Sequence, residues 1–200
     1  MLFACFPQPI LVESNILNEN LEQYETEIKK VVSQIGSMRN SSLNVESTHK
    51  VANNIFDLAT LKGLPEAIFF HARNFLHDIG YTNTDSLYFD NVWANISCKG
   101  DYLFPHVHGG ALISGVYYVK CDIRDKIKFF NTPSMLPEPV EYNQYNAQSG
   151  EHSCIPGSLI MFTSDLQHGT EKQIGEEKIV ISFNMNLRDL KPSPNTMMIS

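Results

Sequence analysis

The sequence predicts an α+β fold in which N-terminal helices pack on one sheet of an antiparallel β-sandwich. Before residue 85, apolar residues repeat every three or four positions, as they do in amphipathic helices. After residue 85, short segments rich in β-branched and aromatic residues alternate with Gly, Pro, Asn and Asp. The chain has 200 residues, which is enough for one domain with a substantial core.

Two helices are expected in the N-terminal part. The first carries its apolar face at Leu21, Tyr24, Ile28, Val31 and Ile35. The second carries its apolar face at Phe69, Ala72, Leu76 and Ile79. Gly36 and Gly80 are natural C-terminal stops, and Pro65 suits the first turn of the second helix. The polar stretch between them, residues 37–50, is predicted to be a loop.

Six later segments have the composition of strands, namely residues 86–100, 113–121, 126–131, 140–146, 157–164 and 177–188. The apolar start of the chain is expected to add a first strand. We therefore expect a single domain over residues 1–190, in which residues 1–84 supply the first strand and helical support. Residues 85–190 form the β core, and residues 191–200 form a C-terminal tail.

Composition and charge favour a soluble cytoplasmic protein. The net charge of -7 argues against a nucleic-acid or anionic-membrane binder. No apolar run approaches the roughly 18 residues of a membrane span, and the apolar start lacks the basic residues of a signal peptide. The cysteines are scattered and form no CxxC motif, so reduced thiols are expected at Cys5, Cys98, Cys121 and Cys154.

Two histidines lie two positions apart in the sequence "FPHVHGG". On an extended chain, His106 and His108 would point to the same side, where both can reach one metal ion. Read alone, the pair fits two surface residues near a turn better than a metal site. His168 follows a strand much later in the chain and can complete a three-imidazole site for iron or zinc. The helix residues His71 and His77, and His152 beside Glu151, are expected to be solvated.

The segment "EKIVISFN" adds a second candidate site. Alternation places Lys178, Val180, Ser182 and Asn184 on one face, opposite an apolar face. Lys178 and Ser182 together can hold a carboxylate through an ammonium charge and a hydroxyl donor. The alternative is a solvent-facing polar edge of the sheet.

These motifs occur in a recognisable order. H-x-H is followed by "SGVYYV", then by P-G-x-L-x-x-F-x5-H, then by a cation in a strand that ends in Phe-Asn. The combination resembles the iron(II)/2-oxoglutarate-dependent oxygenases. It is most similar to a family of bacteria and phages related to the prolyl-hydroxylase group, and the resemblance covers roughly residues 1–188. It implies a double-stranded β-helix (jelly-roll, cupin-like) core with iron at its open end.

The resemblance also implies roles for six residues. The catalytic metal ligands would be His106, His108 and His168, with His108 in the place of the family's usual acidic ligand. Lys178 would take the place of the usual arginine that binds 2-oxoglutarate. Ser182 and Tyr118 would add contacts to the same co-substrate. An acidic residue, such as Asp165 or Asp101, could instead complete the ligand set.

The implied function is that of an Fe(II)- and 2-oxoglutarate-dependent dioxygenase. It would use O2 to hydroxylate a protein side chain or a small molecule, and it would release succinate and CO2. Two alternatives remain: a cupin-type three-histidine dioxygenase or isomerase that does not use 2-oxoglutarate, and an inactive binding module. Trp93, Asn95 and Tyr117 are candidates for the mouth of the barrel, and residues 131–144 for a lid. A homodimer and a monomer are both compatible with the sequence.

Overall fold

The computed structural model of the chain describes residues 8–40, 45–131, 139–143 and 146–189. Its helices are α1 (Leu21–Ile35) and α2 (Leu64–Asp78), with short 3-10 turns η1 (Asn18–Asn20) and η2 (Ile55–Asp57). Its strands are β1 (Ile10–Glu13), β2 (Met38–Asn40), β3 (Val45–Ser47), β4 (Leu87–Cys98), β5 (Ile113–Lys120), β6 (Lys126–Phe130), β7 (Ser149–Ser153), β8 (Leu159–Thr163), β9 (Gln167–Thr170) and β10 (Glu177–Leu187). Neither helix has the length or the apolar stretch that spanning a bilayer requires.

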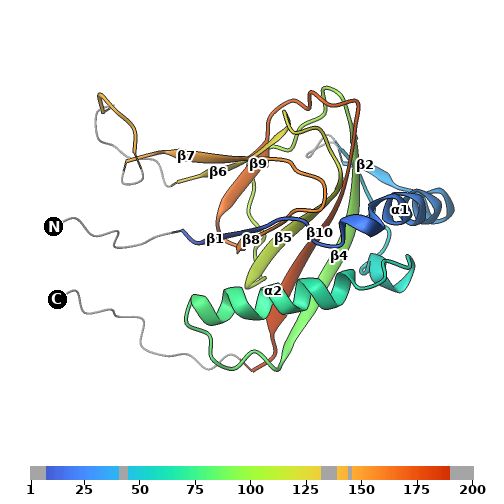
Figure 1. Cartoon of the computed structure of the whole chain (residues 1–200), viewed down its shortest axis with the longest axis horizontal. Coiled ribbons are helices and arrows are strands. Elements are labelled where there is room, and N and C mark those ends of the chain that lie inside the picture. The colour runs from blue at the N-terminus through green and yellow to red at the C-terminus, as the bar shows by residue number, and fades with distance from the viewer. Residues whose placement is uncertain (1–7, 41–44, 132–138, 144–145, 190–200) are drawn as a thin grey trace.

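The strands form two antiparallel sheets, as predicted. The larger sheet has the order β1-β8-β5-β10-β4-β3-β2, and the smaller one has the order β7-β6-β9. Helices α1 and α2 cover one face of the larger sheet, and the smaller sheet lies across from its other face (Figure 1). This mixed architecture, with helices on one side of an antiparallel sandwich, confirms the predicted fold class.

The two faces of the larger sheet have different cores. The helix-side core contains Tyr24 and Ile28 of α1, Ile68 of α2, and Ile181 and Phe183 of β10. The core between the two sheets is smaller and contains residues of β5, β6, β8 and β10, with Phe129 and Phe162 in edge-to-face contact at 5.2 Å. Alternate residues of β10 therefore point into the helix-side core, and the residues between them line the space between the two sheets.

The sequence-based elements need four corrections. The stretch 37–50 contains the short hairpin β2–β3 at the sheet edge, where a loop was expected. Of the predicted strand 140–146, the described residues are not in a strand. His152 was expected to be a solvated loop residue, but it lies in β7 and is half-buried. Gln8 and Pro9 belong to the apolar start that was expected to form the first strand, but they are not in a strand, and β1 begins at Ile10.

Some of the predictions fall on residues outside the described ranges. These are residues 1–7, which include Cys5, most of the candidate lid 131–144, and the tail 191–200.

Gly115 of β5 lies at a close approach of neighbouring groups in the larger sheet. A Cβ atom at this position would lie 2.8 Å from the carbonyl oxygen of Ile160 and would also collide with the ring of Phe183. We expect Gly115→Ala to lower the free energy of unfolding by about 1–3 kcal/mol, the usual cost of overpacking a core. Urea denaturation measures this change.

Gly150→Ala is the matched control for the Gly115 substitution. Gly150 also lies in a strand, but a Cβ atom there would have no neighbour within 4 Å. A stability change in this control equal to that of Gly115→Ala would show that loss of strand glycine, and not the collision, is responsible.

Candidate functional site

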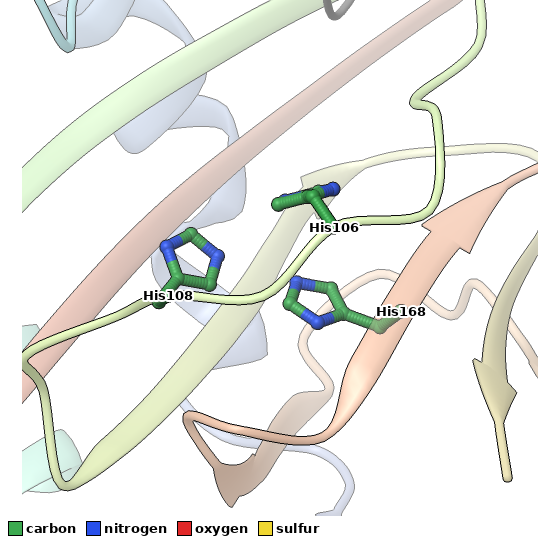
Figure 2. Close-up of side chains that lie close together, drawn as sticks. All are labelled: His106, His108 and His168. Carbon is green, nitrogen blue, oxygen red and sulfur yellow. The ribbon is translucent and has the colours of Figure 1, made fainter. Parts of the chain in front are cut away.

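The three candidate histidine ligands lie together at one end of the space between the sheets. His106 and His108 lie on the loop that connects β4 to β5, and His168 lies in β9 (Figure 2). Each histidine offers one ring nitrogen to a cluster in which these atoms all lie within 4.8 Å of one another. Within the described residues, this is the one group of at least three His, Cys, Asp or Glu side chains that could hold a metal ion.

The backbone explains how distant parts of the chain meet here. His106 and His168 form an isolated antiparallel bridge, with His106 N donating to His168 O at 2.9 Å and His168 N to His106 O at 3.0 Å. Gly169 allows this approach, because a Cβ atom there would lie 2.7 Å from Leu103 O. The His-x-His pair was expected on a strand and His168 in a connection; the structure places the pair in a bridged loop and His168 in β9.

Burial keeps two of the imidazoles neutral at physiological pH. It lowers the pKa of His168 to about 3 and that of His108 to about 4, because the charged form loses its hydration. Neutral imidazole is the form that binds metal ions. Protonation to the charged imidazolium therefore does not compete with metal binding at these two rings.

Two of the three ring tautomers follow from backbone contacts. His106 Nδ1 lies 2.7 Å from Phe104 O, and His168 Nδ1 lies 2.9 Å from Leu166 O. A carbonyl oxygen can only accept a hydrogen bond, so each Nδ1 atom carries the proton. The Nε2 atom of each ring is then free to ligate, as is usual in metal sites where the second ring nitrogen is held by the protein.

A cavity of about 290 Å³ extends from the histidines into the space between the sheets. Its walls are largely apolar and include Val116, Ile127, Phe162 and Val180. Such a chamber excludes water and strengthens any electrostatic contact made inside it. A small ligand can therefore enter beside the histidine cluster and be held by few polar groups.

Lys178 is the buried cation of this chamber. Only 7% of its surface is exposed, and it lines the cavity. Its neighbour Glu177 points to the other face of β10, where it pairs with Lys29 and Lys120 at 2.8 Å. Among the described residues, no hydrogen bond or ion pair reaches the Lys178 ammonium. A buried ammonium without an anion is costly, so the site is suited to a carboxylate ligand.

Ser182 and Tyr118 line the same cavity. Ser182 Oγ accepts a hydrogen bond from Asn95 Nδ2 at 3.2 Å, so its own hydroxyl hydrogen remains available. Burial raises the pKa of Tyr118 well above its usual value, which keeps the phenol protonated and able to donate. The structure thus brings together all six residues named from the sequence.

The remaining candidates divide between the two faces of the sheet. Trp93 and Asn95 line the cavity, and Trp93 packs against His108 with ring centroids 5.7 Å apart. Tyr117 points the opposite way: it lies in the helix-side core and its hydroxyl donates to Ile16 O at 2.6 Å. The suggestion that Tyr117 lies near the mouth was therefore wrong.

Two acidic side chains were alternatives to His108. Asp101 lines the cavity, but its carboxylate accepts from Arg39 at 2.5 Å and from the backbone nitrogen of Cys98 at 2.9 Å. Asp165 is exposed. Neither belongs to the metal-competent cluster of the described residues.

His49 and Asn184 were not recognised as site residues. The His49 ring packs on Trp93 at 4.6 Å between centroids, and the side chain lines the cavity. Its position depends on the short hairpin β2–β3, which the sequence does not reveal. Asn184 was placed on the correct face of its strand by alternation, but its contact with His108 at 3.4 Å could not be foreseen.

Comparison with known proteins agrees with this geometry. Residues 91–184 match the model of a family described as "Putative 2OG-Fe(II) oxygenase". Over this segment the chain is similar to that family of 2-oxoglutarate- and iron(II)-dependent oxygenases. The matched segment contains the three clustered histidines and the cavity residues Lys178 and Ser182. The cofactor and co-substrate of this oxygenase are therefore Fe(II) and 2-oxoglutarate.

Solved structures show that the oxygenase has the double-stranded β-helix fold of its relatives. A Pseudomonas putida prolyl-4-hydroxylase is 10% identical, with a TM-score of 0.62 over 91% of this chain and 94% of that one. HygX from Streptomyces hygroscopicus with nickel, 2-oxoglutarate and hygromycin B bound is 10% identical, with a TM-score of 0.60 over 90% and 84%.

A viral collagen prolyl hydroxylase from Paramecium Bursaria Chlorella virus-1, in complex with 2-oxoglutarate, has the same fold. It is 15% identical to the oxygenase, with a TM-score of 0.56 over 88% of this chain and 94% of that one. A search of curated protein sequences gives no match to the chain.

Proposed function

We propose that this oxygenase is a hydroxylase in which His106, His108 and His168 hold Fe(II) and Lys178 holds the distal carboxylate of 2-oxoglutarate. One observation carries the proposal: a cluster of three imidazole nitrogens lies in the same largely apolar chamber as a buried ammonium that has no anionic partner among the described residues. A metal ligand set alone would fit many activities. The added cation, enclosed by apolar walls, fits a dicarboxylate in particular.

The residues present fit an iron ion. Imidazole nitrogens are suitable ligands for Fe(II), and burial keeps the rings of His108 and His168 neutral. A set of three neutral ligands leaves the full charge of the divalent ion to be balanced by incoming anions. Together with Lys178, this makes the chamber strongly positive and favours a co-substrate with two negative charges.

When bound, Fe(II) and 2-oxoglutarate supply the oxidation: O2 is consumed, a substrate C–H bond becomes C–OH, and 2-oxoglutarate becomes succinate and CO2. The chain's own groups prepare the reactants. The Lys178 ammonium and the Ser182 hydroxyl anchor the far carboxylate, and the Tyr118 phenol donates a further hydrogen bond. Phe162 and Val116 line the chamber and exclude water from it.

The substrate is proposed to be a protein side chain or a small molecule that enters the cavity beside the histidines, whose lining includes Trp93 and His49. The HygX structure contains hygromycin B, a small molecule, and other proteins of similar fold are prolyl hydroxylases, so the fold serves both classes. We further propose a cytoplasmic location, since Cys98, Cys121 and Cys154 are free thiols. An origin in bacteria or phages, a homodimer, and the absence of nucleic-acid and membrane partners remain predictions from the sequence.

The direct test is co-substrate turnover. Protein purified without oxygen and supplied with Fe(II), 2-oxoglutarate and then O2 is expected to release succinate, measured by mass spectrometry. The same mixture without O2 is expected to show the visible charge-transfer band of 2-oxoglutarate bound to Fe(II). Metal binding without this band, and without succinate, would favour a three-histidine enzyme that does not use 2-oxoglutarate.

A further inference from the structure

His108 is held differently from the other two histidines. His106 Nδ1 and His168 Nδ1 face backbone carbonyl oxygens, but His108 Nδ1 lies 3.4 Å from the amide nitrogen of Asn184. One ring nitrogen of His108 points toward the other imidazoles and the other points away from them (Figure 2). Because Nδ1 faces Asn184 on β10, Nε2 is the nitrogen that faces the cluster.

The Asn184 side chain is linked by hydrogen bonds to two buried serine hydroxyl groups. Its Oδ1 accepts from Ser114 Oγ at 2.7 Å, and Ser114 Oγ lies 2.8 Å from Ser164 Oγ. Ser114 and Ser164 are each 1% exposed and Asn184 is 6% exposed. Ser164 also binds the loop directly, because its carbonyl oxygen accepts from the backbone nitrogen of His108 at 2.9 Å.

The orientation of the Asn184 amide decides which nitrogen of His108 has a free lone pair. When Nδ2 donates to His108 Nδ1, the imidazole proton is on Nε2 and blocks ligation there. A half-turn of the amide presents Oδ1 to Nδ1, which then carries the proton and frees Nε2. The amide nitrogen now donates to Ser114 Oγ, and the Ser114 hydroxyl donates to Ser164. Every hydrogen bond persists, because a hydroxyl can both donate and accept.

We propose that Asn184 is a positioning residue that sets the His108 tautomer for metal binding, with Ser114 and Ser164 forming the hydroxyl relay that lets the amide turn. This inference rests on the proposed role of His108 as a ligand. Backbone carbonyls fix His106 and His168 in their ligating tautomer permanently. His108 is the one ligand of the three whose readiness depends on side chains.

Metal affinity is the primary readout, measured by calorimetry with Co(II) on the full chain in the absence of 2-oxoglutarate. Asn184→Ala leaves His108 Nδ1 without its partner. We expect a loss of affinity of about 10- to 100-fold, the range for removing a group that orients a ligating histidine. Asn184→Asp keeps the shape and offers only acceptor oxygens, so we expect affinity equal to or above that of the wild type.

Asn186→Ala is the matched control. Asn186 lies on the same strand and its Nδ2 donates to Gly110 O at 2.9 Å, but no hydrogen bond or ring contact joins it to a described histidine. We expect its metal affinity to stay within about twofold of the wild type, as for other peripheral substitutions. This control separates the His108 contact from a general loosening of the loop.

Nitrogen-15 NMR of histidine-labelled protein with Zn(II) gives the second readout. In the wild type and in Asn184→Asp, the His108 ring is expected to carry its proton on Nδ1. The inference is overturned if Asn184→Ala binds Co(II) like the wild type, or if Asn184→Asp loses as much affinity as Asn184→Ala. Failure of the proposed function is distinguishable, because His168→Ala would then bind Co(II) as tightly as the wild type.

Discussion

Replacing His168 with alanine is expected to lower metal affinity by more than about 100-fold and to abolish 2-oxoglutarate turnover. Groups that only orient a ligating histidine contribute about 10- to 100-fold to affinity, so a ligand itself contributes more. His168 contacts both other candidate ligands, with its ring centroid 4.4 Å from that of His106 and 5.1 Å from that of His108. Titration with Co(II), followed by visible absorption, measures the affinity.

His77→Ala is a suitable control for this experiment, because the His77 side chain is 75% exposed on α2. It is expected to bind Co(II) and to produce succinate like the wild type. Thermal unfolding of both metal-free variants establishes whether the fold is retained. A folded His168→Ala protein with unchanged affinity would place the metal elsewhere and contradict the proposed ligand set.

The sequence points to the candidate ligands because much of their signal is local. In "FPHVHGG" the two histidines are separated by one residue, and on β10 strict alternation separates Lys178 and Ser182 from the residues of the main core. No local sequence pattern indicates the proposed role of Asn184. That role depends on the register that places Asn184 of β10 opposite Ser114 of β5, and on the loop that returns His108 to this point.

The fold was predictable where a periodic pattern is long. Helix α1 begins at Leu21 and ends at Ile35, directly before the expected stop at Gly36. The hairpin β2–β3 was missed because strands of three residues are too short to show a period of two. The adjacent tyrosines of β5 raise a related problem. Tyr118 faces the cavity and Tyr117 faces the helices. Alternation predicts that they point to opposite faces, but the sequence does not show which face of the strand is turned toward the helices.

Replacing Lys178 with methionine is expected to raise the KM for 2-oxoglutarate by about 30-fold or more, with a smaller effect on kcat at saturation. Methionine keeps the length of the side chain and its apolar packing but removes the charge. The carboxylate of the co-substrate would then be buried without a counter-ion. Removing one partner of a buried charge pair costs about 2–5 kcal/mol, which corresponds to this change in affinity. Succinate release at varied 2-oxoglutarate concentrations measures the effect.

Lys99→Met is the control for the lost charge, because Lys99 pairs with Glu176 on the surface and its side chain is 63% exposed. A second co-substrate sharpens the test. 2-Oxopentanoate has the same chain length as 2-oxoglutarate but no distal carboxylate, so it cannot use the Lys178 ammonium. The wild type should strongly prefer 2-oxoglutarate, and Lys178→Met should lose most of this preference. Mere damage to the chamber would weaken both co-substrates equally, and a preference that survives the substitution would mean that another group binds the distal carboxylate.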